Sequence, residues 1–542
     1  MSKLFERLLE KRGLDSTFLH PKYENLADPY LLPDLEKATA RIATSIKNHE
    51  RILIYGDYDV DGVTASTAME EALVLAGVKP ENIDIMLPDR FADGYGMSPR
   101  LITRAKKRGV RLVITVDCGS KNHAIIEELN ILKIDTIVTD HHECGADLPE
   151  AVAVVNPKRP DFTLDSYGLK DLAGVGVAFK LAQGLVKKGL IAPGQEKWLL
   201  DLVLIGTICD NMLLTGENRI LGYYGVKVLE KTRRAGLKEL ITKARINSLT
   251  AESIGFQIGP RLNAAGRLKT ADLSLNLLRA KTPTEAAYLA DKLENLNTRR
   301  KTEQQSAMKE IIARGVSNDP VIIEAGTWHE GVLGIIAGRL VEEYQRPAFV
   351  LAELENGTFK GSGRSFGDFS LAAALDFAKD AIIAGGGHAG AAGVRVDGKN
   401  LYAFREKINE YYNSLHLPDQ THYLSVNADL DIESLSELSL DFIEELKTLE
   451  PFGPGNEEPI FRLQNVDILE TRRMGSEGQH LRLDVRDKSG KIFKLITFYA
   501  PEHWLTLTPE NRIAPLIKLT ENDFNGIKSP EGRIVDIEFL NC

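Results

Sequence analysis

The sequence predicts an α/β protein with a parallel-sheet domain, a second α/β domain joined to it by a long helix, and a C-terminal all-β domain. Three observations predict this. In the first third of the chain, short β-branched runs alternate with helix-like stretches. The stretch 284–314 repeats apolar residues at helical spacing and contains neither Gly nor Pro. After residue 418 the pattern changes to short strands separated by turn signals.

Length and composition set the frame for this prediction. At roughly 100–200 residues per domain, 542 residues imply about three domains, and 43% hydrophobic with 27% charged residues is ordinary for a globular protein. No apolar run approaches the ~20 residues needed to cross a bilayer. The charged N-terminus has no apolar signal core, and the four cysteines are scattered without C-x-x-C spacing. We therefore expect a cytoplasmic protein with no membrane association.

The first domain, predicted over residues 1–280, has an amphipathic helical leader at its N-terminus, and the alternating pattern follows it. Its predicted strands are 51–56, 82–87, 111–116, 135–139 and 151–156, and its predicted helices between them are 64–76, 99–107 and 123–132. Such alternation is typical of βαβ crossovers and a parallel sheet, in which ligands bind outside the carboxyl ends of the strands. From about residue 169 this domain is predicted to be mostly helical.

Three further segments follow. Residues 281–316 are predicted as the connector helix. Residues 317–418 repeat an α/β pattern and contain two glycine-rich stretches, GSGRS and AGGGHAGAAG. Residues 419–542 are predicted as an OB-like β-barrel, with strands near 461–469, 480–485, 492–498, 513–519 and 534–540.

Acidic residues follow the apolar runs of the first domain. The first strand ends in GDYDVDG, where Asp57 and Asp59 project the same way while Asp61 points elsewhere or caps the next helix. The other members of this group are Asp117 after the third strand, Asp140, His141 and His142 after the fourth, and Asp210 after the apolar run LVLIGTIC. The sequence therefore predicts a carboxylate-rich edge of the sheet with one or two imidazoles.

Carboxylates packed this densely repel one another, and divalent cations relieve that repulsion. The donor set favours Mn²⁺ or Mg²⁺ over zinc because no thiolate recurs at ligand spacing. Two ions that share a carboxylate would suit phosphoester hydrolysis. A lone D-x-D is more often a solvated turn or a helix cap, and a lone HH pair is usually structural. Four acidic ends in one predicted sheet favour the metal site, while Cys118 and Cys209 are interpreted as packing residues.

The glycine-rich stretches of the second α/β domain predict phosphate binding. Ser362 and Arg364 alternate on one face of a predicted strand in GSGRS, and small residues surround His388 in GGGHAGAAG. Such segments expose backbone N–H groups to an anion. Arg261 and Arg267, which flank Asn263 in GPRLNAAGR, supply further bidentate phosphate donors.

Successive motifs of the chain resemble those of the DHH phosphoesterase superfamily, and their order resembles its RecJ-type branch of single-strand-specific 5′→3′ DNA exonucleases. They are GDYDVDG, LPDRFADGYG, VDCG, TDHHE, LAGVGVAFKLAQ and GTICDNMLLTGENR, followed by GPRLNAAGR, GSGRS and GGGHAGAAG of a DHHA1 domain. LEPFGPGNEEPIF, at 449–461, looks like the start of that branch's OB-type domain. The resemblance covers most of the chain, from about Arg51 to Phe461.

The resemblance implies the roles of the acidic residues and histidines. It makes Asp57, Asp59, Asp117, His141 and Asp210 the ligands of two Mn²⁺ or Mg²⁺ ions, with Asp117 bridging both. It also places His142 beside the scissile phosphate, with Asp140 supporting the pair.

It implies roles for the substrate contacts as well. Arg267, Ser362 and Arg364 would form a pocket for the 5′-terminal phosphate, while Arg90 and Tyr95 would contact the strand near the metals. Basic residues at 231–245 and 299–301 could follow the DNA backbone, although helical charge runs are usually solvated faces. Phe452, Phe461 and Tyr499 are candidates for stacking on bases, although most aromatics of a small barrel are core.

The function implied is an exonuclease of DNA repair and recombination, which releases nucleoside 5′-monophosphates from single-stranded DNA. A single-strand-binding protein and a RecQ-type helicase are the expected partners. One alternative is a DHH/DHHA1 phosphodiesterase or pyrophosphatase that acts on short oligonucleotides or cyclic dinucleotides. An alternative of another class is a non-catalytic replication scaffold, against which the complete ligand set speaks.

The net charge of −10 is concentrated in one segment. Residues 428–459 contain ten acidic residues and one basic residue, a net charge of −9. The acidity is therefore a local patch at the start of the β-domain, and it does not argue against DNA binding elsewhere.

Overall fold

The computed structural model describes residues 1–94, 96–163, 167–418 and 426–540. The chain divides into two compact units. The first consists of Met1–Gly259, Leu278–Lys281 and Val426–Cys542, and the second consists of Pro260–Leu277 and Thr282–Ser425. Over the part of the chain that is described, no helix is both long enough and apolar enough to span a membrane.

The first unit contains the predicted parallel sheet. Its strands are β1 (Arg51–Tyr55), β2 (Ile83–Met86), β3 (Val110–Val116), β4 (Asp135–Thr139) and β5 (Ala153–Val155). They pair in parallel in the order β2-β1-β3-β4-β5, so all carboxyl ends meet at one edge. All five predicted strands are confirmed to within two residues at each end, because buried β-branched runs leave few alternatives.

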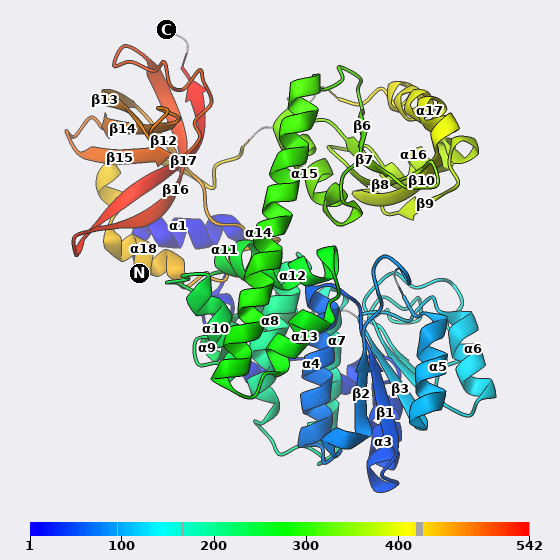
Figure 1. The fold of residues 1–542 in the computed structure, drawn as a ribbon. Helices are drawn as coiled ribbons and strands as arrows, with labels where there is room; N and C mark the ends of the chain where they lie inside the picture. Colours follow the sequence, from blue (N-terminus) through cyan, green and yellow to red (C-terminus); the bar gives the residue numbers. More distant parts are fainter. Residues whose placement is uncertain (95, 164–166, 419–425, 541–542) are drawn as a thin grey trace. The chain divides into compact units, whose positions relative to one another are not determined.

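Helices cover both faces of this sheet, as a fully buried parallel sheet requires. Figure 1 shows α5 and α6 on one face and α4 and α7 on the other. The bounds of the helices in this part are α3 (Leu35–Lys47), α4 (Val60–Leu75), α5 (Pro99–Arg108), α6 (His123–Ile131) and α7 (Gly174–Lys187). Apolar residues of α5 and α6 form one core with Leu53, Val113 and Val138 of the strands.

The helical block after the sheet contains one correction. The run LVLIGTIC was grouped with the strand ends, but the structure forms it into helix α8 (Leu200–Cys209), all of whose residues up to Thr207 are buried. A helix buried on every side has the same apolar pattern as a buried strand. The remaining helices here are α9 (Gly216–Leu229), α10 (Ala235–Lys243), α11 (Ala251–Ser253), α12 (Gly259–Leu268) and α13 (Asp272–Arg279), with a π-helical turn over Ile254–Ile258.

Most of the second unit lies in Thr282–Ser425, and the first helix of this segment is the predicted long helix, α14 (Pro283–Arg314). Its sheet has the order β6-β7-β8-β10-β9, with β6 and β7 parallel and the other pairs antiparallel. The elements are β6 (Ile322–Gly326), α15 (Leu333–Tyr344), β7 (Ala348–Glu353), β8 (Thr358–Arg364), α16 (Leu371–Phe377), β9 (Ala384–Gly387), β10 (Ala391–Asp397) and α17 (Leu401–Ser414).

The stretch AGGGHAGAAG differs from its prediction. It was interpreted as a loop that exposes backbone N–H groups, but most of it lies in β9 and β10, which pair with each other around His388–Gly390. Antiparallel pairing uses many of these N–H groups within the sheet.

The C-terminal region of the first unit is the predicted barrel. Its elements are β11 (Leu430–Ile432), α18 (Leu440–Lys447), β12 (Phe461–Leu463), β13 (Val466–Met474), β14 (His480–Arg486), β15 (Ile492–Thr497), β16 (Arg512–Phe524) and β17 (Ile527–Phe539). The sheet has the order β11-β12-β16-β13-β14-β15-β17, and a further pairing of β16 with β17 closes it. Closure removes the exposed edges of the five strands in the ring.

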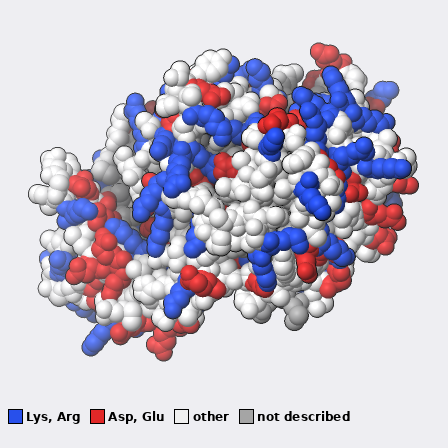
Figure 2. Space-filling model, turned by 90° about the horizontal axis from the view of Figure 1, so that it is seen from below, with Lys and Arg blue, Asp and Glu red and all other residues white. Residues whose placement is uncertain are grey.

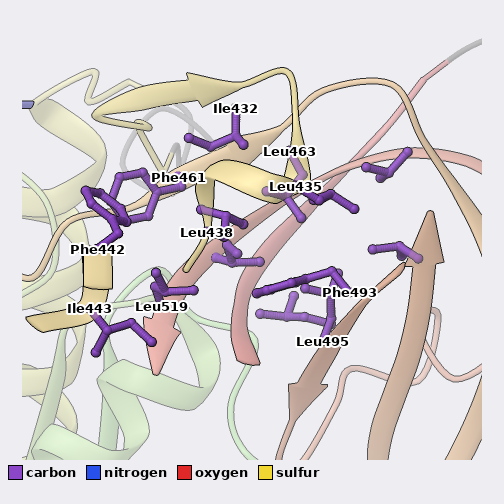
Figure 3. Close-up of a cluster of buried hydrophobic side chains, with 14 of the residues drawn as sticks. Ile432, Leu435, Leu438, Phe442, Ile443, Phe461, Leu463, Phe493, Leu495 and Leu519 are labelled. Atoms are coloured by element: carbon purple, nitrogen blue, oxygen red, sulfur yellow. The ribbon is translucent and has the colours of Figure 1, made fainter. Parts of the chain in front are cut away.

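The barrel core also buries the N-terminal helix. Figure 3 shows Phe442, Phe461, Phe493 and Leu519 among the side chains that fill this core. Leu4, Phe5 and Leu8 of α1 (Lys3–Arg12) belong to the same buried cluster, and Arg12 pairs with Asp429 at 2.7 Å. The amphipathic N-terminus, predicted as a leader of the first domain, thus has its apolar face in the β-domain. The short α2 (Ser16–Leu19) follows it.

Candidate metal centre

The turn after β1 brings two carboxylates together. Asp57 is buried, and Asp59 is the N-cap of α4, where its Oδ1 accepts the N–H of Gly62 at 3.1 Å. One ligand atom from each of Asp57, Asp59 and Asp117 lies within 4.8 Å of the others. The predicted convergence of Asp57 and Asp59 is therefore present. Gly62 is required here, since a Cβ at this position would lie 2.5 Å from the backbone of Asp57.

Asp117 follows β3 in an unusual conformation. Its φ is +62°, in the left-handed region, and its backbone N–H donates to the carbonyl of Thr139 at 2.9 Å. The N-terminus of α7 lies directly against it, because a Cβ on Gly174 would lie 2.5 Å from the Cβ of Asp117. Non-glycine residues in the left-handed region store strain and cluster at functional sites. The fold thus over-determines the position of this carboxylate.

His141 lies among the carboxylates. Its Nε2 is 3.1 Å from Oδ1 of Asp117 and 3.5 Å from Oδ2 of Asp210. Asp210 arrives from the carboxyl end of helix α8 rather than from a strand, and its side chain is 29% exposed. The five residues expected as ligands therefore converge, although they come from three strands and one helix.

Asp61 is the acidic residue whose place the sequence left open. Asp61 lies within α4 but caps another helix, α7. Its carboxylate accepts the N–H groups of Gly174 and Val175, in the first turn of α7, at 2.6 and 2.9 Å. Its Oδ2 also lies 3.8 Å from Nε2 of His141, and with His141 and Asp210 it forms a group that could hold a metal ion. The third acid of DYDVD was the only sequence signal for this contact.

Asp140 serves the two histidines. Its Oδ1 accepts the backbone N–H groups of His141 and His142 at 2.8 and 3.1 Å and lies 2.9 Å from Nδ1 of His142. Its Oδ2 accepts the N–H of Ser120 at 3.0 Å. These bonds, chiefly the one with His142, outweigh burial and lower the pKa of Asp140 to about 2, while Asp140 raises the pKa of His142.

The electrostatics of the cluster fit a bound cation. Burial is the largest cause that raises the pKa values of Asp57, Asp61 and Asp117, and mutual repulsion adds to it. Burial also lowers the pKa of His141 to about 3. Oδ1 of Asp57, Oδ1 of Asp117 and Nε2 of His141 are buried and make no hydrogen bond. Such orphaned acceptors are costly, and divalent cations with oxygen and imidazole ligands satisfy them.

The predicted strand contacts near this cluster are partly described. The guanidinium of Arg90 lies 5.1 Å from the ring centroid of Tyr58, the residue between Asp57 and Asp59. Arg90 is therefore held close to the carboxylates. Tyr95 lies outside the described residues.

The residues expected to bind the terminal phosphate lie in the second unit. Ser362 and Arg364 face Gly334 in the first turn of α15, where a Cβ would lie 3.0 Å from Oγ of Ser362 and 3.1 Å from Nη2 of Arg364. Arg267 donates to the carbonyl of Gly331, just before α15, at 3.5 Å. The structure brings these three side chains to one helix N-terminus, an anion-binding feature. The sequence analysis did not identify Gly334 as part of this site. The glycines of GVLG at the start of a helix are the sequence feature that could have indicated it.

Other members of the predicted phosphate set are placed differently. Arg261 forms an ion pair with Glu294 of α14 at 2.6 Å, so its guanidinium is engaged within the unit. Asn263 is half-buried on α12, and His388 is exposed in the turn between β9 and β10. The turn adjoins Arg364, because Ala391 pairs with Arg364 across the sheet.

The basic clusters are largely engaged in ion pairs and stacking. Arg234 is buried with Glu71 and Asp201, Arg233 stacks on Trp198 at 3.5 Å, and Arg299 pairs with Glu303 at 2.7 Å. Figure 2 shows Lys and Arg side chains interspersed with Asp and Glu over the face that it presents. Arg234 in particular is a structural residue, so the interpretation of 231–245 as a backbone track does not hold for it.

The aromatic candidates of the barrel separate by burial. Phe461 is fully buried and packs edge-on against Phe442, so its interpretation as a stacking residue is wrong. Phe452 is partly buried against the same core. Tyr499 is 79% exposed beside His480, and the sequence missed its neighbour Phe498, which is 54% exposed.

Comparisons with known proteins agree with this arrangement. Residues 51–207 match the DHH family, N-terminal domain, residues 318–414 the DHHA1 domain, and residues 429–536 the RecJ OB domain. The chain is 34% identical to the single-stranded-DNA-specific exonuclease RecJ of Escherichia coli (strain K12), over 97% of this chain and 94% of that one. The chain belongs to the RecJ family. It is also 35% identical to RecJ of Bacillus subtilis (strain 168), over 99% of this chain and 68% of that protein.

Solved RecJ structures share the fold. The crystal structure of RecJ in complex with Mn²⁺ from Thermus thermophilus superimposes with a TM-score of 0.85 at 30% identity, covering 99% of this chain and 76% of that one. The same protein in complex with Mg²⁺ gives a TM-score of 0.78 at 28% identity, covering 99% and 75%. The predicted α/β architecture with a long helix and a C-terminal β-domain is thereby confirmed.

Proposed function

We propose that the protein is a metal-dependent exonuclease, specific for single-stranded DNA, that releases nucleoside 5′-monophosphates from the 5′ end. The observation that carries the proposal is the buried convergence of Asp57, Asp59, Asp117, His141 and Asp210, several of whose ligand atoms make no hydrogen bond. The RecJ relatives, which are named single-stranded-DNA-specific exonucleases, support the substrate class.

The proposed ligands of two Mn²⁺ or Mg²⁺ ions are these five residues. Asp117 is proposed as the shared ligand because it belongs both to the group with Asp57 and Asp59 and to the group with the two histidines. When bound, the ions supply an activated water and stabilise the leaving oxygen of the phosphodiester. Asp61, which caps α7, is proposed to support His141 and Asp210 from behind.

His142 is proposed to contact the reacting phosphate. Its side chain is 33% exposed, whereas that of His141 is 6% exposed, so His142 is the more accessible of the two. Asp140 accepts from Nδ1 of His142 and raises the pKa of the ring, which favours a positively charged donor toward a phosphoryl oxygen. Arg90, held over Tyr58, is proposed to guide the adjacent nucleotide.

The 5′-terminal phosphate is proposed to bind at the N-terminus of α15. Ser362 and Arg364 lie against Gly334 in the first turn of this helix, and Arg267 donates to the carbonyl of Gly331 just before it. Helix dipole, backbone N–H groups and bidentate guanidinium groups all favour phosphate. A pocket for the terminal phosphate would select strand ends over internal positions, which is what makes a nuclease an exonuclease.

The cellular setting is proposed from the substrate. An enzyme restricted to single strands needs unwound DNA, so we propose a RecQ-type helicase and a single-strand-binding protein as partners in DNA repair and recombination. The described cysteines Cys118, Cys144 and Cys209 are free thiols, which suits a reducing cytoplasm.

The test uses one oligonucleotide, labelled separately at each end, with and without a 5′-phosphate, in the presence of Mn²⁺. We expect a labelled mononucleotide at once from the 5′-labelled strand and a late, shortened ladder from the 3′-labelled strand. The Asp117→Asn variant is expected to release no product from either labelled strand. Preferential turnover of a free dinucleotide over the long strand, or degradation from the 3′ end, would contradict the proposal.

A further inference from the structure

The motif PFGPGN connects the start of the β-domain to the segment that carries Asp210. The backbone N–H of Leu214 donates to the carbonyl of Pro454 at 2.7 Å. Leu214 is 2% exposed, and a Cβ on Gly453 would lie 2.7 Å from its Cδ1. Glycine at 453 is what allows this close approach between two segments far apart in the sequence.

The segment from Asp210 to Gly216 connects helices α8 and α9. At its start, Asn211 has φ +57°, and the N–H groups of Asn211 and Met212 bond back to the last turn of α8. In its middle, the carbonyl of Leu213 accepts a hydrogen bond from the side chain of Asn218 in α9 at 2.9 Å. The contact of Leu214 with Pro454 adds a restraint at the next residue that comes from outside the two helices.

The segment Glu450–Asn456, which contains PFGPGN, is held by its own hydrogen bonds. Asn456 is 3% exposed, and its Nδ2 donates to the carbonyls of Leu449 and Pro451 at 2.8 and 2.9 Å. Gly453 and Asn456 also exchange backbone hydrogen bonds of 3.0 and 2.9 Å. Buried bonds of this kind fix the loop in one conformation, so it can transmit a restraint to Leu214.

Arg219 of α9 fastens the same connection. Its guanidinium is buried and donates to the carbonyls of Thr448, Leu449 and Glu450, at the carboxyl end of α18, where the helix dipole is negative. The Cζ atom also lies 4.4 Å from the ring centroid of Phe18. Helix α9, which follows the Asp210 segment, is thus hydrogen-bonded directly to the start of the β-domain through Arg219.

We propose that the segment Glu450–Asn456 is a positioning element for Asp210, so that the β-domain helps to set the affinity of the metal centre. Carboxylate ligands bind a metal tightly only when their supports hold them in place. Releasing Leu214 would let Asp210 move away from His141 without removing any ligand. The proposal rests on the proposed role of Asp210 as a metal ligand.

The test is Asn456→Ala in the full-length protein. Mn²⁺ binding is measured from the electron paramagnetic resonance signal of free Mn²⁺, and turnover of a 5′-phosphorylated dinucleotide is measured against Mn²⁺ concentration. We expect Mn²⁺ affinity to fall by about 10-fold, in the range of lost outer supports of a metal site. Because the ligands stay in place, high Mn²⁺ should restore the maximal turnover.

The matched control is Glu445→Ala. Glu445 lies on α18 and bonds to Ser2 rather than to the Asp210 segment, so this variant should bind Mn²⁺ like the wild type. Near-ultraviolet circular dichroism checks that both variants fold. If Asn456→Ala fails to fold, Gly453→Ala, which crowds Leu214 directly, takes its place with the same readouts and the same expected shift.

Asp210→Asn separates this proposal from the one that it rests on. If Asp210→Asn binds Mn²⁺ with wild-type affinity, Asp210 is not a ligand and both proposals fail at this residue. If Asp210→Asn loses affinity while a folded Asn456→Ala variant keeps the wild-type value, the ligand role stands and the positioning role is overturned.

Discussion

The carboxylate of Asp140 and the imidazole of His142 form a directed pair, with Oδ1 of Asp140 2.9 Å from Nδ1 of His142. The same oxygen accepts two backbone N–H groups, so it can move little. A carboxylate that orients a histidine in this way fixes its tautomer and the direction of its free nitrogen. Asp140 is thus a positioning residue within the DHH motif.

Asp140→Asn is expected to lower kcat by about 10- to 100-fold, because the neutral amide neither orients nor charges the ring as the carboxylate does. The KM for a long strand should change little, since strand contacts are untouched. Glu143→Gln is the control, because Glu143 lies just after the motif with a side chain that is 64% exposed. If the Asp140→Asn variant has the same kcat as the wild type, the orientation of His142 by Asp140 is unimportant for catalysis.

Gly174→Ala is expected to destabilise the protein and weaken Mn²⁺ binding together. The added Cβ would lie 2.5 Å from Cβ of Asp117, and forcing atoms into a filled core costs about 1–3 kcal/mol. Urea unfolding measures the free energy, and Mn²⁺ titration measures the affinity.

Gly176→Ala in the same helix is the comparison. There the nearest atom is Cδ2 of Leu172 at 3.0 Å, the end of a flexible side chain. This variant should keep wild-type Mn²⁺ affinity. Equal Mn²⁺ affinity in both variants would mean that α7 does not position Asp117.

Asp117→Asn is expected to raise the melting temperature of the metal-free protein while abolishing its stabilisation by Mn²⁺. Replacing one of several crowded carboxylates removes repulsion, and functional sites commonly reduce stability in this way. At 100 times its Kd, Mn²⁺ should stabilise the wild type by about 2.7 kcal/mol.

Thermal unfolding with Mn²⁺ and with a chelator measures both effects. Asp161→Ala, at a carboxylate whose side chain is 62% exposed, is the control and should respond to Mn²⁺ like the wild type. Undiminished stabilisation of Asp117→Asn by Mn²⁺ would place the metal elsewhere.

Arg364→Ala is expected to remove the preference for a 5′-phosphate. Wild-type protein should show a lower KM for a 5′-phosphorylated strand than for a 5′-hydroxyl strand, and loss of a charged hydrogen-bond donor, worth about 1.5–3 kcal/mol, should raise the former by roughly 10- to 100-fold. Arg339→Ala is the matched control, because Arg339 lies on the exposed face of α15, the helix at whose N-terminus the phosphate is proposed to bind. The phosphate pocket is refuted if both variants keep the wild-type ratio of the two KM values.

The sequence predicted those parts of the site that local pattern determines. Asp57, Asp117 and Asp140 follow buried β-branched runs, and parallel strands must bring their carboxyl ends to one edge. The sequence predicts Asp210 as part of the cluster but does not show that a helix carries it. An apolar run that is buried on every side has no hydrophobic periodicity by which a helix could be told from a strand.

Long-range contacts explain what the sequence could not predict. Asp61 caps α7, which begins more than a hundred positions later, and no local signal links the two. Arg234 belongs to a basic run that resembles a solvated face, yet Glu71 and Asp201 bury it. Phe461 lies on β12 and faces the barrel core, whereas Tyr499 lies just after the end of β15, outside the sheet; the sequence alone does not separate these two positions.

Phe461→Ala and Tyr499→Ala should therefore affect different properties. Phe461 is fully buried against Phe442, so its truncation should cost about 3–5 kcal/mol of unfolding free energy. Tyr499 is 79% exposed, so its truncation should change stability by less than about 0.5 kcal/mol. If its ring stacks on a base, binding of a long single strand should weaken by about 1–3 kcal/mol. Urea unfolding and fluorescence anisotropy, in an Asp117→Asn background that prevents cleavage, measure the two quantities. Wild-type affinity of Tyr499→Ala for the long strand would exclude this ring from the DNA path.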